Sequence, residues 1–258
     1  MKVLKSTLVV IYYLFLQIIV CSGLIIWKVL TDEEWVNRLI ESNGFADNVA
    51  LTSELVLPAV IIADLIIVIP LLFKSKFSMF KKVELKDGID LIAIGLACNL
   101  VISYIVSYLE TLPIAESYNQ LIEFSLNGDA IFMILSAGIL APLVEELCFR
   151  YWMFDICKEK SDTYKIILSA LMFGLAHLNI IQSAYAFIMG LILGYTYAKT
   201  KNLWCSILIH FSMNMSSVLL EVLPTGGQYV LDLIFLASLI YVPVSLLMRK
   251  NVLTRRAA

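Results

Sequence analysis

The chain has 258 residues, of which 60% are hydrophobic and 16% charged, and its mean hydropathy is +0.88. Soluble globular domains are about half apolar and about a quarter charged, so this composition excludes an ordinary water-soluble domain. The net charge of −2 carries little information, because in a membrane protein the distribution of charge matters more than its sum.

The apolar residues fall in blocks of about 20, the length that a helix needs to cross a bilayer. Lys2 and Lys5 precede the first block, as in a signal peptide, but the block is too long for a signal core and lacks an AxA-like cleavage site. We therefore expect a retained first helix. The pattern predicts an all-α, polytopic membrane bundle of about eight spans, at 8–30, 51–73, 89–109, 129–157, 165–180, 183–199, 202–222 and 228–248.

The spans divide into three predicted parts. Residues 1–128 hold three spans and their loops, residues 129–222 hold four spans that carry a cluster of polar groups, and residues 223–258 hold the last span and a basic tail. Gly190 and Gly194, four residues apart in the sixth span, are typical of close helix packing.

The basic residues predict the orientation of the chain. If the N-terminus is cytoplasmic, the loops outside carry only Lys28 and Arg38, Arg150 lies within a span, and the remaining 16 of the 19 fall inside. Such an excess of Lys and Arg in cytoplasmic loops is the known pattern of membrane proteins. We therefore expect a multi-pass protein of the cell membrane with both termini in the cytoplasm. The sixteen are Lys2, Lys5, Lys74, Lys76, Lys81, Lys82, Lys86, Lys158, Lys160, Lys165, Lys199, Lys201, Arg249, Lys250, Arg255 and Arg256.

Three charged residues interrupt the fourth span, in the stretch EELCFR. Glu146 and Arg150 are spaced i, i+4, so they can pair along one helix face and reduce the cost of burying both charges. Glu145 points about 100° away and has no such local partner. We expect its carboxylate to face a water-containing cavity, where it suits proton transfer.

The two histidines of the chain, His177 and His210, also fall inside predicted spans, and Asn214 follows His210 by one helical turn. At 1.5 Å per residue, Glu145, His177 and Asn214 lie roughly 18–20 Å from the cytoplasmic ends of their helices, and His210 roughly 12 Å. Each residue alone could be a packing device between helices. Their similar depth predicts one shared site. Asp64, isolated in the second span, is better explained by helix packing or local water.

The motifs EExxxR (Glu145, Glu146, Arg150), FxxxH (Phe173, His177) and HxxxN (His210, Asn214) resemble, in order and spacing, those of the CPBP family. This family includes the type II CAAX prenyl endopeptidases and the Abi-like bacteriocin-processing and self-immunity proteases. The resemblance covers roughly residues 129–215.

The resemblance implies an intramembrane glutamate-type endopeptidase. Glu145, aided by His177, would activate a water for attack on the scissile carbonyl. His210 and Asn214 would donate hydrogen bonds to the developing oxyanion, while Glu146, Arg150 and Phe173 would support the site. Two histidines and a glutamate could also hold zinc, but HExxH is absent and Asn is a poor zinc ligand, so we expect no metal cofactor.

The implied partner is a membrane-associated peptide or protein substrate in the lipid bilayer, cleaved at or near the inner face, with no nucleic acid. A bacteriocin or signalling-peptide leader is one such substrate. From the residues alone two other functions stay open. A proton-coupled transporter would use the same intramembrane groups as a relay, and a scaffold that regulates a sensor kinase would need no chemistry. The sequence leaves the oligomeric state open.

Overall fold

The computed structural model describes residues 2–42, 45–74, 79–111, 115–116, 118–120 and 129–248. Within these ranges the long elements are all helices, and seven stretches are long and apolar enough to cross a membrane, which confirms the all-α polytopic fold. They are α1 (Lys2–Thr31), α3 (Phe45–Lys74), α4 (Leu85–Leu109), the continuous helical stretch Ala130–Ile156, α10 (Ile180–Thr200), α11 (Leu203–Val222) and α12 (Thr225–Leu247).

The fifth predicted span is the exception. Helix α9 (Asp162–Leu175) has 14 residues and is about 21 Å long, which is too short for a bilayer core of about 30 Å. The apolar pattern continues to residue 180, but the helix cannot, because Leu178 has a φ of 56°. The side chain of Asn179 then accepts hydrogen bonds from Ile181 N and Gln182 N and so caps the start of α10.

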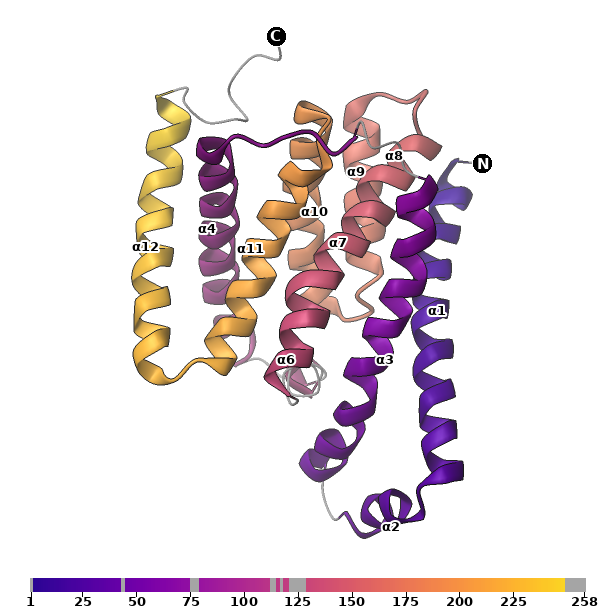
Figure 1. Ribbon diagram of the computed structural model, residues 1–258. Coiled ribbons are helices and arrows are strands. Elements are labelled where there is room, and N and C mark those ends of the chain that lie inside the picture. The colour runs from indigo at the N-terminus through magenta and orange to yellow at the C-terminus, as the bar shows by residue number, and fades with distance from the viewer. Residues whose placement is uncertain are drawn as a thin grey trace.

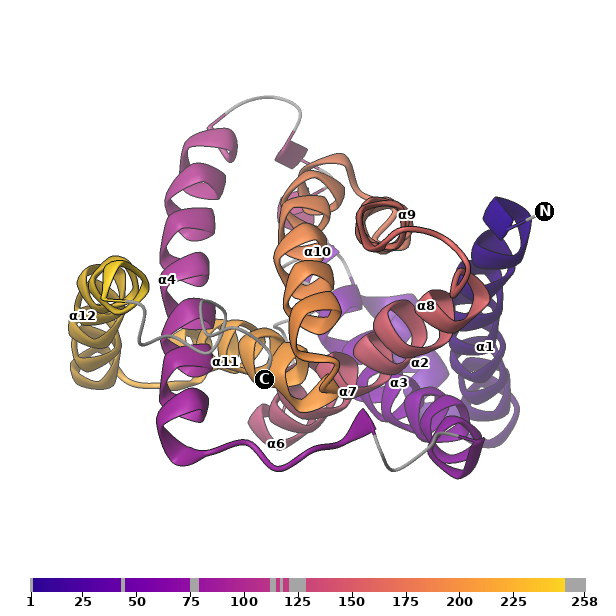
Figure 2. The same cartoon turned by 90° about the horizontal axis from the view of Figure 1, so that it is seen from above.

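The helices form a bundle in which α4 lies between α12 and α11, and α10 packs against both α9 and α11 (Figures 1 and 2). On the other side of the bundle, α1 pairs with α3, and the two are joined through the short helix α2 (Glu33–Glu41). The first residues of α1 and the last of α12 lie at the same end of the bundle, which we call the terminus end. The α1–α3 pair extends past the other helices at the opposite end (Figure 1).

The fourth span contains two π-helical segments. It runs through α6 (Ala130–Met133), the π-helical η3 (Ile134–Leu140), α7 (Ala141–Glu146), the π-helical η4 (Leu147–Trp152) and α8 (Met153–Ile156). Each π-turn leaves backbone groups without their usual partners four residues away, and such turns recur at functional sites. The stretch EELCFR lies across the second of them.

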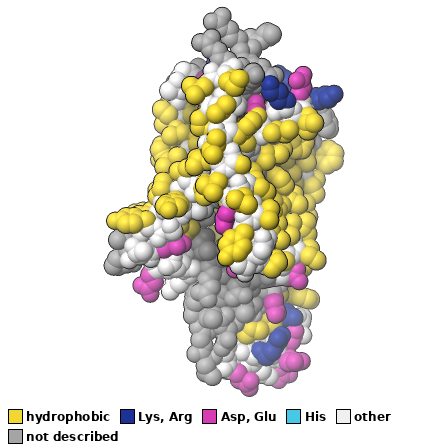
Figure 3. All heavy atoms as spheres, turned by 90° about the vertical axis from the view of Figure 1, so that its left-hand side faces the viewer, with side chains coloured by type: hydrophobic (Ala, Val, Ile, Leu, Met, Phe, Trp, Pro, Cys, Tyr) yellow, Lys and Arg dark blue, Asp and Glu magenta, His cyan; other side chains and the backbone are white. Residues whose placement is uncertain are grey.

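The outer surface of the bundle is apolar. Figure 3 shows the face formed by α12, where hydrophobic side chains cover most of the surface and charged ones gather mainly toward the ends. Leu233, Leu236 and Ile240 on this helix are each more than half exposed. Inside the bundle, a Cβ added to Gly190 would lie 2.7 Å from the Ala170 Cα, so this glycine serves close packing of α10 against α9. The chain is a multi-pass membrane protein.

Candidate active site

A cavity of about 720 Å³ lies in the middle of the bundle and is lined by all four predicted catalytic residues, Glu145, His177, His210 and Asn214. They come from α7, from the turn after α9, and from α11. Ligand pockets have volumes of about 300–1,000 Å³. The convergence expected from matched depth is therefore present in the structure, although His177 reaches the site from a turn and not from a spanning helix.

Glu145 is held from two sides. The Tyr13 hydroxyl on α1 donates a hydrogen bond to Glu145 Oε1 at 3.1 Å, and His210 Nε2 lies 3.5 Å from Glu145 Oε2. The residue is 9% exposed, so its carboxylate is close to buried but stays in the cavity wall. A carboxylate in this position can accept a proton from a bound water.

Glu146 and Arg150 form a fully buried ion pair behind Glu145. Arg150 Nη1 lies 3.0 Å from Glu146 Oε1, as the i, i+4 spacing predicts. The same carboxylate oxygen lies 3.0 Å from His210 Nδ1. Because a carboxylate paired with Arg is an acceptor, we assign a proton to Nδ1. Glu146 thus fixes both the orientation and the tautomer of His210.

Phe173 packs against three of these polar groups. Its ring centroid is 4.9 Å from that of His177 and 5.6 Å from that of His210, both edge-on, and the Arg150 guanidinium lies 4.5 Å from the same centroid. His177 Nδ1 lies 2.8 Å from the Phe173 carbonyl oxygen, which can only accept, so Nδ1 is the donor and Nε2 is left for the cavity. The two residues of the FxxxH motif thus act together, because Phe173 orients the His177 ring through its carbonyl oxygen and packs against it through its own ring.

Asn214 donates a hydrogen bond to a carbonyl of the fourth span that has no backbone donor. The Ala141 N–H bonds to the Ser136 carbonyl, five residues back, and Pro142 has no N–H, so neither can donate to the Ala137 carbonyl. Asn214 Nδ2 supplies that donor at 3.1 Å. Its second N–H and its Oδ1 are not needed for this bond. Asn214 thus joins α11 to η3 and still presents an amide at the cavity wall.

Two residues of α1 belong to the site and are absent from the predicted set. Tyr13 and Gln17 are one helical turn apart and both line the cavity. Gln17 Nε2 donates to Asp64 Oδ1 at 3.3 Å and links α1 to α3, which agrees with a packing role for Asp64. Their i, i+4 spacing in an otherwise apolar span was the available sequence signal.

The cavity extends away from the terminus end. Its lining begins at Asn99 on α4 and at His210 on α11, and it continues toward the opposite ends of both helices.

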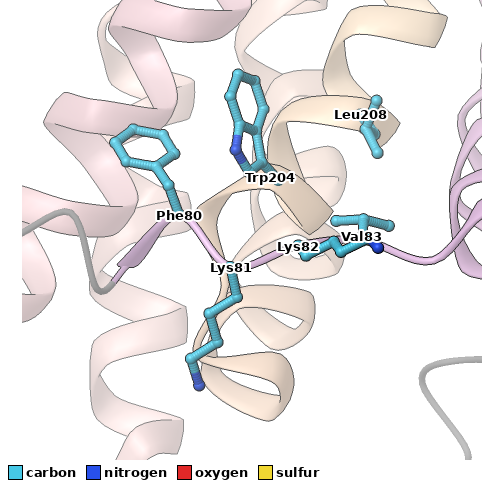
Figure 4. Close-up of a pocket in the computed structure, with 6 residues that line it drawn as sticks. All are labelled: Phe80, Lys81, Lys82, Val83, Trp204 and Leu208. Carbon is cyan, nitrogen blue, oxygen red and sulfur yellow. The ribbon is translucent and has the colours of Figure 1, made fainter.

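A second hollow of about 380 Å³ lies at the terminus end and shares no residue with the cavity. Figure 4 shows this hollow beside Trp204, where the Lys81 side chain points away from the indole ring. It is lined by Phe80, Lys81, Lys82, Val83, Trp204 and Leu208.

Over the described ranges, no three His, Cys, Asp or Glu side chains form a group that could hold a metal ion. The donors that the site does offer are a carboxylate, two imidazoles and an amide around one cavity. Such a set can deprotonate a water and stabilise an oxyanion.

Comparisons with known proteins place the similarity in the same part of the chain. Residues 127–216 match the family model described as "Type II CAAX prenyl endopeptidase Rce1-like". A segment of 93 residues is 30% identical to the "Putative membrane peptidase YdiL" of Bacillus subtilis (strain 168), and covers 36% of this chain and 38% of that protein. No solved structure matches the chain.

Proposed function

We propose that this protein is an intramembrane endopeptidase of the CPBP kind with Glu145 as its general base. The match of residues 127–216 to the model of the Rce1-like type II CAAX prenyl endopeptidases supports this proposal. The observation that carries the proposal is the single cavity shared by Glu145, His177, His210 and Asn214. Polar groups inside a membrane are costly and mark functional sites, and here three separate segments of the chain bring four of them to one cavity.

In the proposed reaction, Glu145 takes a proton from a water whose oxygen attacks the scissile carbonyl carbon. His177 assists through Nε2, because its Nδ1 is already bonded to Phe173 O. The new C–O bond pushes the carbonyl electron pair onto oxygen. When the intermediate collapses, the C–N bond breaks and the proton held by Glu145 passes to the leaving nitrogen.

The oxyanion of this intermediate is stabilised by His210 and Asn214. Asn214 contributes the N–H that is not bonded to Ala137 O. His210 contributes Nε2 when that nitrogen carries a proton, and Glu146 holds the ring in place through Nδ1 at 3.0 Å. Donors that are fixed before the reaction stabilise the transition state most effectively. No metal takes part in this scheme.

The substrate in this proposal is a membrane-associated peptide or protein, of which a bacteriocin or signalling-peptide leader is one example. The enzyme lies in the cell membrane, and the lysine-rich terminus end lies in the cytoplasm.

The test compares the peptides released from membranes that contain the wild-type protein or the Glu145→Gln variant. We expect the variant to lose at least about 100-fold of the cleavage rate, as for other general bases. Glu159→Gln is the matched control, because Glu159 is 75% exposed and lies far from the cavity lining. Equal product from Glu145→Gln would end the proposal, and solute flux in sealed vesicles without cleavage would support a transporter.

A further inference from the structure

One wall of the cavity is a polar stripe on α4, outside the segment that matches the family. Asn99, Ser103, Ser107 and Glu110 recur at intervals of three or four residues, so they share one helix face, and all four line the cavity. From Asn99 to Glu110 the stripe rises about 16 Å. Polar residues in a spanning helix face the protein interior or water. This stripe therefore marks a hydrated path along α4.

The path becomes more open with distance from Glu145. Asn99 is 4% exposed and bonds to Ser216 and Ser217 on α11, whereas Ser103, Ser107 and Glu110 are all exposed. The facing wall is provided by the first turns of α10, where Tyr185 packs edge-on against Tyr118. Helix α9 ends at Leu175 and does not continue toward this end.

In the other direction the cavity is closed. Leu91, Ile94, Leu193, Cys205 and Ile209 form a buried cluster between it and the terminus end, and none is more than 6% exposed. The hollow at Trp204 (Figure 4) is lined by Val83 and Leu208, which pack against this cluster. Substrate thus has a polar route from one end of the bundle and a packed core at the other.

We propose that the substrate enters along this α4 groove from the extracytoplasmic side, and that it is an exported peptide or an outer-leaflet segment of a membrane protein, threaded as an extended chain. The inference rests on the proposed function and on the orientation set by the lysine-rich loops. It distinguishes this protein from an enzyme that trims the cytoplasmic tail of a lipid-anchored protein.

The direct test is labelling of single cysteines by a charged, membrane-impermeant thiol reagent, in full-length protein with Cys21 and Cys98 replaced by serine. The other three cysteines are buried. Ser103→Cys probes the groove. Ile105→Cys is the control for depth, since Ile105 is on the same helix, 52% exposed and absent from the cavity lining. Lys158→Cys reports the terminus end.

We expect the reagent to label Ser103→Cys from outside, at least about tenfold faster than Ile105→Cys, because only the groove admits a charged molecule. Lys158→Cys should react only in inverted vesicles. The inference is overturned if Ser103→Cys reacts no faster than Ile105→Cys, or reacts only from the side that labels Lys158→Cys. This readout needs no peptidase activity, so it can fail or succeed independently of the proposed function.

A second arm uses activity. Ser103→Trp should fill the groove and lower the cleavage rate about tenfold or more, whereas Ile105→Trp, toward lipid, should leave it unchanged. Equal rates for the two variants would contradict entry along α4.

Discussion

The two halves of the bundle on either side of Glu145 are built differently. Toward the terminus end, Leu147, Phe149, Leu203 and Ile207 are buried in one continuous core. Toward the opposite end, the same helices enclose a cavity of about 720 Å³ with serine, asparagine and tyrosine side chains in its walls. The solid half holds the catalytic groups in position, and the hollow half leaves space for water and substrate.

The charges are divided in the same way. The Glu146–Arg150 pair lies fully buried in the solid half, while Glu145, one residue earlier, lies at the boundary with the cavity. Adjacent carboxylates on a helix point in directions about 100° apart. A single dipeptide therefore supplies one structural and one reactive carboxylate. Substitutions in the two halves should separate stability from activity.

The largest effect on stability should come from Arg150→Met. Removing one partner of a buried ion pair leaves the other charge uncompensated and costs about 3–5 kcal/mol. Thermal unfolding in detergent measures the loss, and Arg38→Met, at an exposed position on α2, is the control. If the two variants unfold at the same temperature, the solid half does not depend on this pair.

A smaller effect, confined to activity, should follow from Tyr13→Phe. The variant loses the hydrogen bond to Glu145 Oε1 but keeps the ring that packs against Phe149. We expect kcat to fall about tenfold, equivalent to about 1.4 kcal/mol, with KM and unfolding temperature unchanged.

Tyr12→Phe is the matched control for this prediction. Tyr12 is adjacent in the sequence, is 38% exposed, and contacts Trp152 through its ring. Its variant should retain wild-type kcat. A decrease shared by both variants would mean that α1 contributes packing to the site and no hydrogen bond of consequence.

The smallest effect should come from the surface of the terminus end. Lys165 and Lys201 bond to Asp162, and these bonds hold the pKa of that carboxyl below its ordinary value. The ionised Asp162 therefore stabilises the folded state at pH values above the pKa that this carboxyl has in the unfolded chain. This stabilisation is lost as the pH falls through the lower pKa of the folded state. Since the Asp162 side chain is half exposed, Asp162→Asn should lower the free energy of unfolding by less than about 1 kcal/mol at neutral pH and should not change it in acid. Unfolding measured at both pH values checks this.

The site could be predicted from the sequence because depth along a spanning helix is set by residue count. His210 and Asn214 lie on the regular helix α11, and Glu145 lies on the continuous helical stretch Ala130–Ile156, so a rise of about 1.5 Å per residue was enough to place them at similar depth. The Glu146–Arg150 pair followed from i, i+4 spacing alone, and its distance of 3.0 Å confirms it.

Features that depend on the tertiary arrangement could not be predicted in this way. Apolar composition gave no sign that α9 ends at Leu175, because the break arises from the backbone of Leu178 and the cap at Asn179. The i, i+4 spacing of Tyr13 and Gln17 indicates a polar face on α1, but only the fold shows that Tyr13 reaches Glu145 on α7. The direction of the cavity depends on which half of each helix is packed, and a linear pattern does not contain that information.

The missing N–H of Pro142 has a consequence for what the structure requires of Asn214. As long as proline stands there, the Ala137 carbonyl needs a donor from outside its own helix, and Asn214 provides it. The loss of stability on replacing Asn214 by a residue without an amide should therefore be smaller in a chain whose residue 142 has a backbone N–H. The structural requirement for Asn214 is thus set by Pro142, separately from its proposed part in the reaction.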